Sequence, residues 1–248
     1  MSERASVLGL PVDAISPDAL RQSLLQIARG DRLTHLVTLN PEQVIAARRD
    51  EQMRSAITAA DIVTADGIGI VLALRAQGKT VPSRITGVAL GDELARSAIP
   101  TFLLGGRPGA AELAADRLRE RFPGAKIVGA WSGGRSSPED DNASLKRIRE
   151  SGAVAVLVAY GAAGQLAWIE RNRDALEGIG IRIAIGVGGA LDYAAGIVQQ
   201  PPAWARRFGI EWTIRLLREP WRWRRQVVLP VFAVLALLEA VQVRLGRR

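Results

Sequence analysis

The fold is decided by the segment Thr34–Gly78, which reads THLVTLNPEQVIAARRDEQMRSAITAADIVTADGIGIVLALRAQG. It contains two short runs of β-branched and apolar residues, Thr34–Leu39 and Asp61–Ala65. Between them, Pro41–Ile57 spaces its apolar residues as a helix does and opens with a proline, which suits a first helical turn. The segment therefore predicts a strand, a helix and a second strand, the order from which parallel sheets are built.

Strand and helix patterns continue to alternate beyond this segment. Further strands are predicted at Thr101–Leu104, Lys126–Ala130, Ala153–Tyr160 and Ile181–Val187. Further helices are predicted at Ser16–Ala28, Pro108–Phe122 and Pro138–Glu150. The alternation predicts an α/β fold, with a largely parallel sheet covered by helices on both faces.

Composition excludes several kinds of protein. The chain has no cysteine, which excludes disulfide scaffolds, zinc–cysteine sites and thiol nucleophiles. Its single histidine, His35, excludes a histidine-rich metal site and is predicted to be packed or paired rather than catalytic. The sequence lacks the P-loop motif, the G-x-G-x-x-G motif and the D-x-D pair that holds a metal on a diphosphate. The first residues show no leader pattern, so we expect a cytosolic protein.

Positive charge is concentrated at the C-terminal end. Residues 203–248 contain ten arginines against three glutamates, so they carry +7 of the net charge of +8. Four of the six tryptophans, Trp204, Trp212, Trp221 and Trp223, also lie there. We therefore predict an α/β catalytic domain over residues 1–202 and a basic, tryptophan-rich appendage over residues 203–248 that meets a polyanion.

Glycines follow most of the predicted strands. They include Gly67, Gly105 with Gly106, Gly161, and Gly188 with Gly189. In an open parallel sheet, ligands bind beyond the carboxyl ends of the strands, where glycine lets backbone N–H groups approach a phosphate or a sugar. Glycine also ends strands for purely conformational reasons. The recurrence favours a nucleotide-type ligand without identifying it.

Three longer motifs stand out. The segment Thr34–Gly78 contains T-x-N followed by A-D-G-x-G-[IV], and Gly161–Ile169 has the sequence GAAGQLAWI. The segment Gly186–Gln226 contains P-x-W and then G-[LI]-E-W-x-x-R-L-x-x-E-P-x-R. With these motifs, most of the chain resembles the WecG/TagA/CpsF glycosyltransferases, glycosyltransferase family 26.

The resemblance implies a Rossmann-like α/β domain of the GT-E type with a C-terminal, helical, membrane-associating appendage. It also implies an inverting transfer without metal or other cofactor. The donor would be a UDP-sugar carrying N-acetylmannosamine, its uronic acid or glucose. The acceptor would be a polyprenyl-diphosphate-linked sugar of bacterial surface polysaccharide synthesis, at the cytoplasmic face of the plasma membrane. The resemblance is also compatible with a homo-oligomer.

The chain departs from the family pattern at several positions, including Gly164, where lysine is frequent, and Pro201, where alanine is common. Ala163 stands where proline is usual, and Leu166 replaces a glutamate. Ala89 stands where aspartate is frequent, and Gln200 where arginine is common. These changes concern loops that contact sugars, and Leu166 suggests an alternative function, a catalytically weakened membrane-bound scaffold of the same fold.

Four polar residues near strand ends are the strongest catalytic and binding candidates. Asp66 follows a buried strand and is the predicted base, unless it only caps the helix that starts at Ile68. Thr38 and Asn40 end the neighbouring strand, where they would bind the acceptor or orient Asp66, or serve only as turn and cap residues. Gln165 would donate to a sugar or phosphate, or be a surface residue.

The remaining candidates would bind the donor. Arg84 falls in the stretch RITGVAL, which the resemblance includes, and Asp192 would shape the nucleotide or sugar pocket. Arg215, Arg222 and Arg225 are spaced by seven and three, so one helix would present them as a stripe that stabilises the leaving diphosphate or contacts lipid headgroups. The glycines among the predicted binding residues are Gly105, Gly106 and Gly188.

The apolar run Val227–Leu238 has only twelve residues before Glu239, whereas a membrane-spanning helix needs about 20. We expect a helix lying at an anionic membrane surface, with a buried helix and a true span as alternatives. The apolar run also makes a nucleic-acid partner the weaker interpretation of the basic charge, so none is expected.

Overall fold

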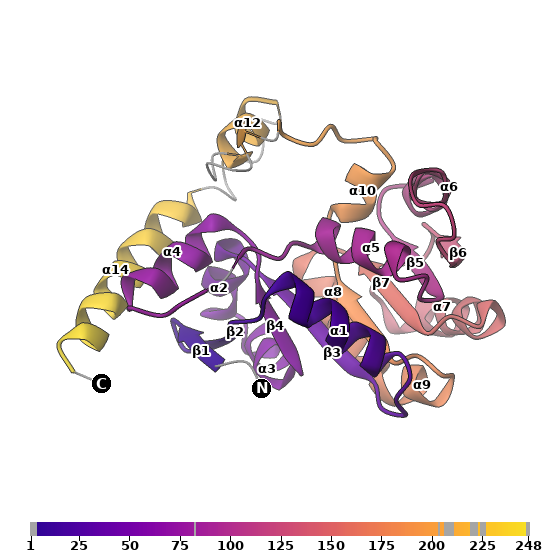
Figure 1. The fold of residues 1–248 in the computed structure, drawn as a ribbon, viewed down its shortest axis with the longest axis horizontal. Helices are drawn as coiled ribbons and strands as arrows, with labels where there is room; N and C mark the ends of the chain where they lie inside the picture. Colours follow the sequence, from indigo (N-terminus) through magenta and orange to yellow (C-terminus); the bar gives the residue numbers. More distant parts are fainter. Residues whose placement is uncertain are drawn as a thin grey trace.

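The computed structural model describes residues 4–81, 83–202, 204–205, 211–218 (without the side chains of 215 and 218), 223 and 227–246. Its centre is a six-stranded parallel sheet in the order β4-β3-β8-β7-β5-β6, with a separate antiparallel hairpin of β1 and β2 (Figure 1). The strands are β1 Arg4–Val7, β2 Leu10–Asp13, β3 Thr34–Leu39, β4 Ile62–Ala65, β5 Thr101–Gly105, β6 Ile127–Trp131, β7 Ala155–Ala159 and β8 Ile183–Gly186.

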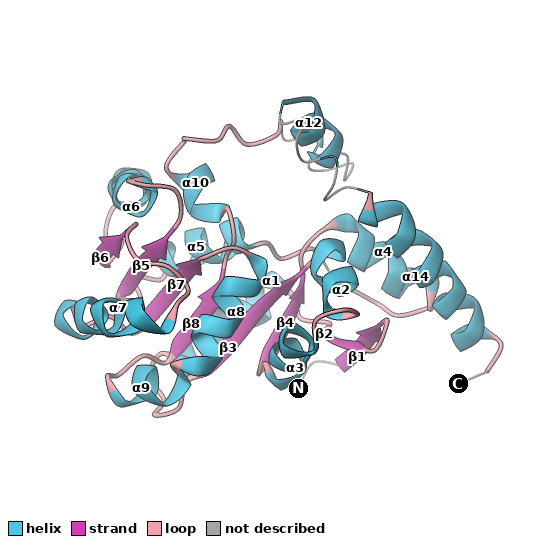
Figure 2. Ribbon diagram, turned by 180° about the vertical axis from the view of Figure 1, so that it is seen from behind, coloured by secondary structure: helices cyan, strands magenta, loops and turns pink. Residues whose placement is uncertain are grey.

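Helices cover both faces of the sheet (Figure 2). They are α1 Pro17–Ile27, α2 Pro41–Ala47, α3 Glu51–Ala59, α4 Ile68–Ala76, α5 Gly87–Arg96, α6 Ala110–Arg121, α7 Pro138–Ser151, α8 Ala162–Arg171, α9 Arg173–Gly178, α10 Ala190–Ala194, α12 Glu211–Arg218 and α14 Val228–Arg244. Buried residues of α1, α5, α6 and α10 form one core with the sheet. Those of α2, α3, α7, α8 and α9 pack on the opposite face. The predicted α/β fold is confirmed.

The structure divides one predicted helix. Where the spacing predicts a single helix over Pro41–Ile57, α2 ends at Ala47 and α3 begins at Glu51. Asp50 is the reason, since its side chain accepts a hydrogen bond from the Met53 N–H at 2.9 Å and so caps a new helix. The hairpin of β1 and β2, whose strands have four residues each and bury alternate residues, was not predicted.

The last described helix, α14, returns to the body of the protein and runs beside α4 (Figures 1 and 2). Its Phe232 and Ala236 are buried in the core formed by α2, α3, α4 and the hairpin. Glu239 accepts hydrogen bonds from the Leu8 N–H and from Gln77 Nε2, both at 2.9 Å. Among the described residues, no helix is long and apolar enough to cross a membrane.

Candidate active site

The polar candidates meet at the carboxyl ends of three neighbouring strands. The pairing of Leu39 with Ala65 places Asn40 beside Asp66, because each is the next residue of its strand. On the other side of β3, Val37 pairs with Gly186 of β8, so Thr38 lies beside the loop that contains Gly188. The parallel register therefore gathers residues from three distant parts of the sequence at one edge of the sheet.

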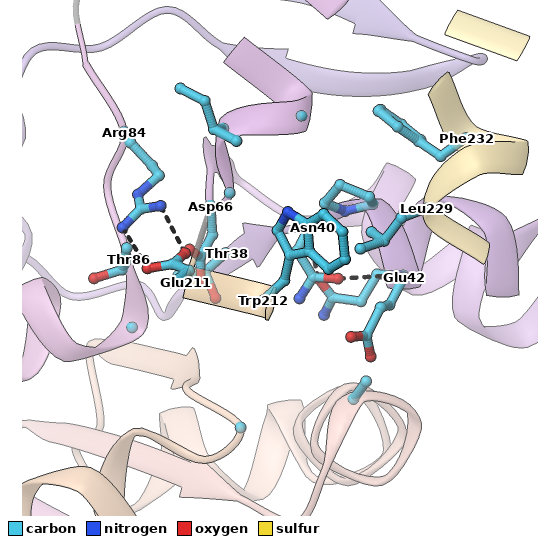
Figure 3. A pocket seen from close by; sticks show the side chains of 18 of the residues that line it. Thr38, Asn40, Glu42, Asp66, Arg84, Thr86, Glu211, Trp212, Leu229 and Phe232 are labelled. Atoms are coloured by element: carbon cyan, nitrogen blue, oxygen red, sulfur yellow. Dashed lines mark hydrogen bonds and ion pairs between the residues drawn. The ribbon is translucent and has the colours of Figure 1, made fainter. Parts of the chain in front are cut away.

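A cavity of about 1090 Å³ opens at this edge (Figure 3). Six predicted site residues line it: Thr38, Asn40, Asp66, Arg84, Gln165 and Gly188. The cavity is bounded by the strand ends, the start of α8, and the helices α4, α12 and α14. Most of the predicted polar site thus lies in one place.

Asp66 stands at a tight turn between β4 and α4. Its backbone N–H donates to the Leu39 carbonyl at 2.8 Å, which continues the pairing of the two strands. The next residue, Gly67, is the N-cap residue of α4 and has a φ of +100°, a conformation that favours glycine. A Cβ atom there would also lie 3.2 Å from Pro41 Cδ. The N-cap position belongs to Gly67 rather than Asp66, and the aspartate lines the cavity.

Thr38 and Asn40 both have structural bonds. The Thr38 hydroxyl is buried and donates to the Gly186 carbonyl at 3.4 Å, which links β3 to β8 beside the cavity. Asn40 Oδ1 accepts from the Gln43 N–H, and Gln43 Oε1 accepts from the Asn40 N–H, each at 3.0 Å. Asn40 therefore closes a capping box at the start of α2, as the alternative interpretation expected, while it also lines the cavity.

Gln165 is not a surface residue, since only 2% of it is exposed. Its Oε1 accepts a hydrogen bond from the Gly188 N–H at 2.7 Å, so it holds the loop after β8 against the start of α8. A Cβ atom at Gly186 would approach Gln165 Nε2 to 2.6 Å, so any larger residue there would displace the Gln165 side chain. Gln165 and Gly188 thus form one rigid wall of the cavity.

Arg84 connects the body to α12. Its guanidinium donates to both carboxylate oxygens of Glu211, at 2.7 and 3.2 Å, as Figure 3 shows. The neighbouring backbone is fixed to β4, because the Ile85 N–H donates to the Ala65 carbonyl at 2.9 Å and the buried Thr64 hydroxyl donates to the Ile85 carbonyl at 3.2 Å. These bonds hold a planar cation at the cavity, where it suits a phosphate or a carboxylate.

Gly105, Gly106 and Asp192 are not among the residues that line the cavity. Asp192 instead accepts from the Arg107 N–H at 3.1 Å and forms an ion pair with that side chain at 3.7 Å. A Cβ atom at Gly106 would lie 3.5 Å from Asp192 Oδ1, so these three predicted residues lie near the end of β5.

The predicted arginine stripe is only partly placed. Position 215 lies on α12, four residues after Glu211, and the side chain of Arg215 is outside the described structure. Arg222 and Arg225 also lie outside the described residues. Their predicted role at the diphosphate stays a prediction.

The cavity contains polar and aromatic residues that sequence reasoning missed: Glu42, Thr86, Tyr193, Glu211 and Trp212. Thr86 carries a local signal, because it follows Arg84 and caps α5 by accepting from the Ala89 N–H at 3.2 Å. Glu211 and Trp212 come from the tail, where the sequence indicates only charge and membrane contact. Within the part of the chain that the structure describes, no three histidine, cysteine, aspartate or glutamate side chains gather as a metal site.

His35 lies at the other end of β3 from the cavity. It is fully buried, and its Nδ1 lies 2.7 Å from a carboxylate oxygen of Glu170. This hydrogen bond, more than any other contact, lowers the pKa of Glu170 below its ordinary value. The prediction that His35 is packed and paired is confirmed.

The geometry allows two kinds of chemistry. A carboxylate in the position of Asp66 can accept a proton from a hydroxyl group bound in the cavity. A guanidinium in the position of Arg84 can stabilise negative charge on a leaving group that takes the place of the Glu211 carboxylate. Both groups line one cavity and extend from neighbouring backbone segments, so a single ligand complex could contact them together.

The chain is similar to a family of known proteins. The model of the glycosyl transferase WecG/TagA/CpsF family matches residues 5–245. The N-acetylglucosaminyldiphosphoundecaprenol N-acetyl-beta-D-mannosaminyltransferase of Bacillus subtilis (strain 168) is 30% identical over 206 residues, which cover 82% of this chain and 78% of that protein. The protein of the same name from Bacillus spizizenii has the same identity and coverage.

Proposed function

Because this chain belongs to the WecG/TagA/CpsF glycosyl transferase family and is a glycosyltransferase, we propose that it transfers a sugar from a UDP-sugar to a polyprenyl-diphosphate-linked sugar. N-acetylmannosamine is the first donor sugar to test, because the two relatives are named as N-acetylmannosaminyltransferases. Its uronic acid and glucose are the other two. The observation that carries the proposal is Asp66, set at the carboxyl edge of the sheet in the wall of a large cavity.

We propose that Asp66 is the general base of an inverting transfer. The acceptor hydroxyl attacks the anomeric carbon, its proton passes to the Asp66 carboxylate, and the bond from that carbon to the UDP oxygen breaks. A displacement from the opposite face inverts the anomeric centre. Thr38 and Asn40 lie beside Asp66, where they would orient the acceptor hydroxyl or the carboxylate.

The leaving UDP needs positive charge as its bond breaks. Arg84 would supply part of it, and Arg215, Arg222 and Arg225 would supply the rest without a divalent metal. The Gly188 loop held by Gln165 would bind the donor through its backbone. We also propose Gly105, Gly106 and Asp192 as contacts of the donor. They lie near the carboxyl end of β5, which belongs to the same sheet as the strands that end at the cavity.

We further propose that the protein works at the cytoplasmic face of the plasma membrane, bound peripherally to anionic lipid. The outer side of α14 supports this, because it exposes large apolar side chains. They include Val231, Leu238 and Val241. The arginines of residues 203–248 would contact the lipid phosphates.

The alternative of an inactive scaffold depends on Leu166. In the structure this leucine is buried in the core with residues of α3 and β4 and does not line the cavity. Ala89 and Gln200, two other departures from the family pattern, do line the cavity and are the better candidates for choosing the sugar.

Replacement of Asp66 by asparagine tests the proposal. Asp66→Asn keeps the shape of the side chain and removes the base, so turnover should fall by about 100-fold or more, the scale of general-base catalysis. UDP affinity, measured by calorimetry, should stay within about twofold, because the base is not needed to bind the nucleotide. Asp116→Asn, at a side chain that is 67% exposed, is the matched control. Near-normal turnover of Asp66→Asn would exclude Asp66 as the base.

A further inference from the structure

The cavity extends from its polar end into an apolar trough between α4 and α14. Three residues of α4, Leu72, Ala73 and Ala76, form one side of this trough. Three residues of α14, Ala233, Ala236 and Leu237, form the other. Each set recurs at helical spacing, so the trough runs along α4 and along the first half of α14, as far as Leu237. Figures 1 and 2 show α4 and α14 lying side by side.

The shape of the trough comes from the sizes of these residues. Ala73 and Ala236 are buried and form a shallow floor. Leu72 and Leu237 stand beside it with 54% and 62% of their surfaces exposed. Exposed leucines beside a floor of alanines leave apolar surface in contact with water, and a hydrocarbon ligand would cover that surface.

The two helices are locked at a fixed separation. Phe232 packs under the trough, where a Cβ atom on Gly69 of α4 would lie 3.3 Å from its ring. At the far end, Glu239 accepts hydrogen bonds from Gln77 Nε2 and from the Leu8 N–H, each at 2.9 Å. A trough with hydrogen bonds at one end and a packed base is a preformed site rather than a gap between mobile elements.

The chemistry of the trough excludes a sugar or a nucleotide there. None of its six side chains has a polar atom, and the backbone of both helices is bonded within the helices. A hydroxyl or phosphate placed there would lose its hydrogen bonds to water without replacement, which is unfavourable. The polar end of the same cavity, with Asp66 and Arg84, offers the partners that the trough lacks.

We propose that the trough holds the first isoprene units of the lipid-linked acceptor, while its sugar and diphosphate occupy the polar end. One molecule with a polar head and a hydrocarbon chain matches one cavity with a polar end and an apolar end. From Leu229 to Leu237 the helix rises by about 12 Å, which accommodates the start of such a chain and not all of it. This inference rests on the proposed function for the identity of the acceptor.

The test compares two acceptors with the same sugar diphosphate, one with a long polyprenyl chain and one with a short alkyl chain, both in detergent. The ratio of their kcat/KM values measures how much the chain contributes. Ala233→Phe fills the trough and should lower this ratio about tenfold, the effect of losing contacts equal to one or two buried methylene groups. Leu237→Ser is a second test variant, which makes a smaller change at an exposed position of the trough. It should also lower the ratio of the two kcat/KM values.

Val234→Phe is the matched control, because residue 234 neighbours Ala233 on α14, is 60% exposed and does not line the cavity. It should leave the ratio unchanged. The inference is overturned if the wild type shows no preference for the long chain. It is also overturned if Ala233→Phe keeps the wild-type ratio, if Val234→Phe lowers it equally, or if Ala233→Phe acts by changing the oligomeric state in size-exclusion chromatography.

A binding measurement separates this inference from the proposed function. Polyprenyl phosphate, which has no sugar to accept a glycosyl group, is titrated while tryptophan fluorescence is recorded, since Trp212 and Trp223 line the cavity. Ala233→Phe should weaken its binding about tenfold, on the same scale of lost apolar contact, and Val234→Phe should not. If the wild type transfers no sugar but shows this pattern, the proposed function fails and the trough stands. If transfer occurs and the variants bind alike, the trough fails.

Discussion

Replacement of Phe232 by alanine tests whether α14 is part of the folded body or a detachable tail. Only 3% of Phe232 is exposed, and its ring packs against Gly69 within the core shared by α2, α4 and the hairpin. Truncation of a fully buried phenylalanine costs about 3–5 kcal/mol, because transfer free energy is lost and a cavity remains. That is a large share of the roughly 5–15 kcal/mol by which a protein is stable.

The assay is thermal unfolding, followed by circular dichroism. In a protein of this size, 1 kcal/mol shifts the midpoint by about 2–4 °C, so a loss of about 3–5 kcal/mol in Phe232→Ala should lower it by about 6–20 °C. Turnover should also fall when the short-chain acceptor is used in detergent, because Phe232 lines the cavity. A detachable membrane tail would instead leave both the midpoint and this turnover unchanged.

Val234→Ala is the control for the same helix. Its side chain is 60% exposed, so the substitution should change stability by no more than about 0.5 kcal/mol. The reasoning would be refuted if Phe232→Ala and Val234→Ala unfolded at the same temperature. In that case α14 would contribute nothing to the stability of the body.

Two further predictions concern metal and pH. Treatment with a chelator should leave the transfer rate unchanged, and a rate that disappears and returns with magnesium or manganese would contradict the proposed role of the arginines. The hydrogen bond with His35 lowers the pKa of Glu170; desolvation and Asp61 oppose this effect, and Arg173 adds to it. The ionised Glu170 carboxylate therefore stabilises the fold above the ordinary carboxyl pKa. This stabilisation is lost as the pH falls through the lowered pKa. The wild type should therefore unfold at a higher denaturant concentration than Glu170→Gln at pH 7, and this difference should shrink below about pH 4, near the ordinary carboxyl pKa; a difference independent of pH would contradict it.

The sheet could be predicted from the sequence because its strands are buried on both faces. Short, continuous apolar runs such as Thr34–Leu39, separated from one another by helical patterns, are typical of a covered parallel sheet, and this strand has the predicted bounds. The break between α2 and α3 could have been found from Asp50, a good N-cap residue followed by Glu51. The periodicity of apolar residues hid it, because both helices bury residues on the same side of the sheet.

The candidate site could be predicted only where strand ends define it. Asp66, Thr38 and Asn40 follow from parallel register, which brings consecutive strand ends together. The partner of Arg84 could not be predicted in this way, since Glu211 is 127 residues away and reaches the cavity on a helix outside the sheet. Gln165 shows the same limit in its partner, because it lies on the buried face of α8 with Trp168 and Ile169, but its hydrogen bond joins it to Gly188, 23 residues away.

The tail helix shows why composition alone left three interpretations open, a helix at the membrane surface, a buried helix and a membrane span. α14 is apolar on almost every side, so the pattern does not distinguish a face that packs from a face that meets lipid. Glu239 identifies the face that packs on the body, because a partly buried carboxylate needs hydrogen-bond donors. The Leu8 N–H and Gln77 Nε2 are those donors. Those bonds set the rotation of the helix. Residues such as Ala233 then face the trough, and Val234, about 100° further round, faces outward.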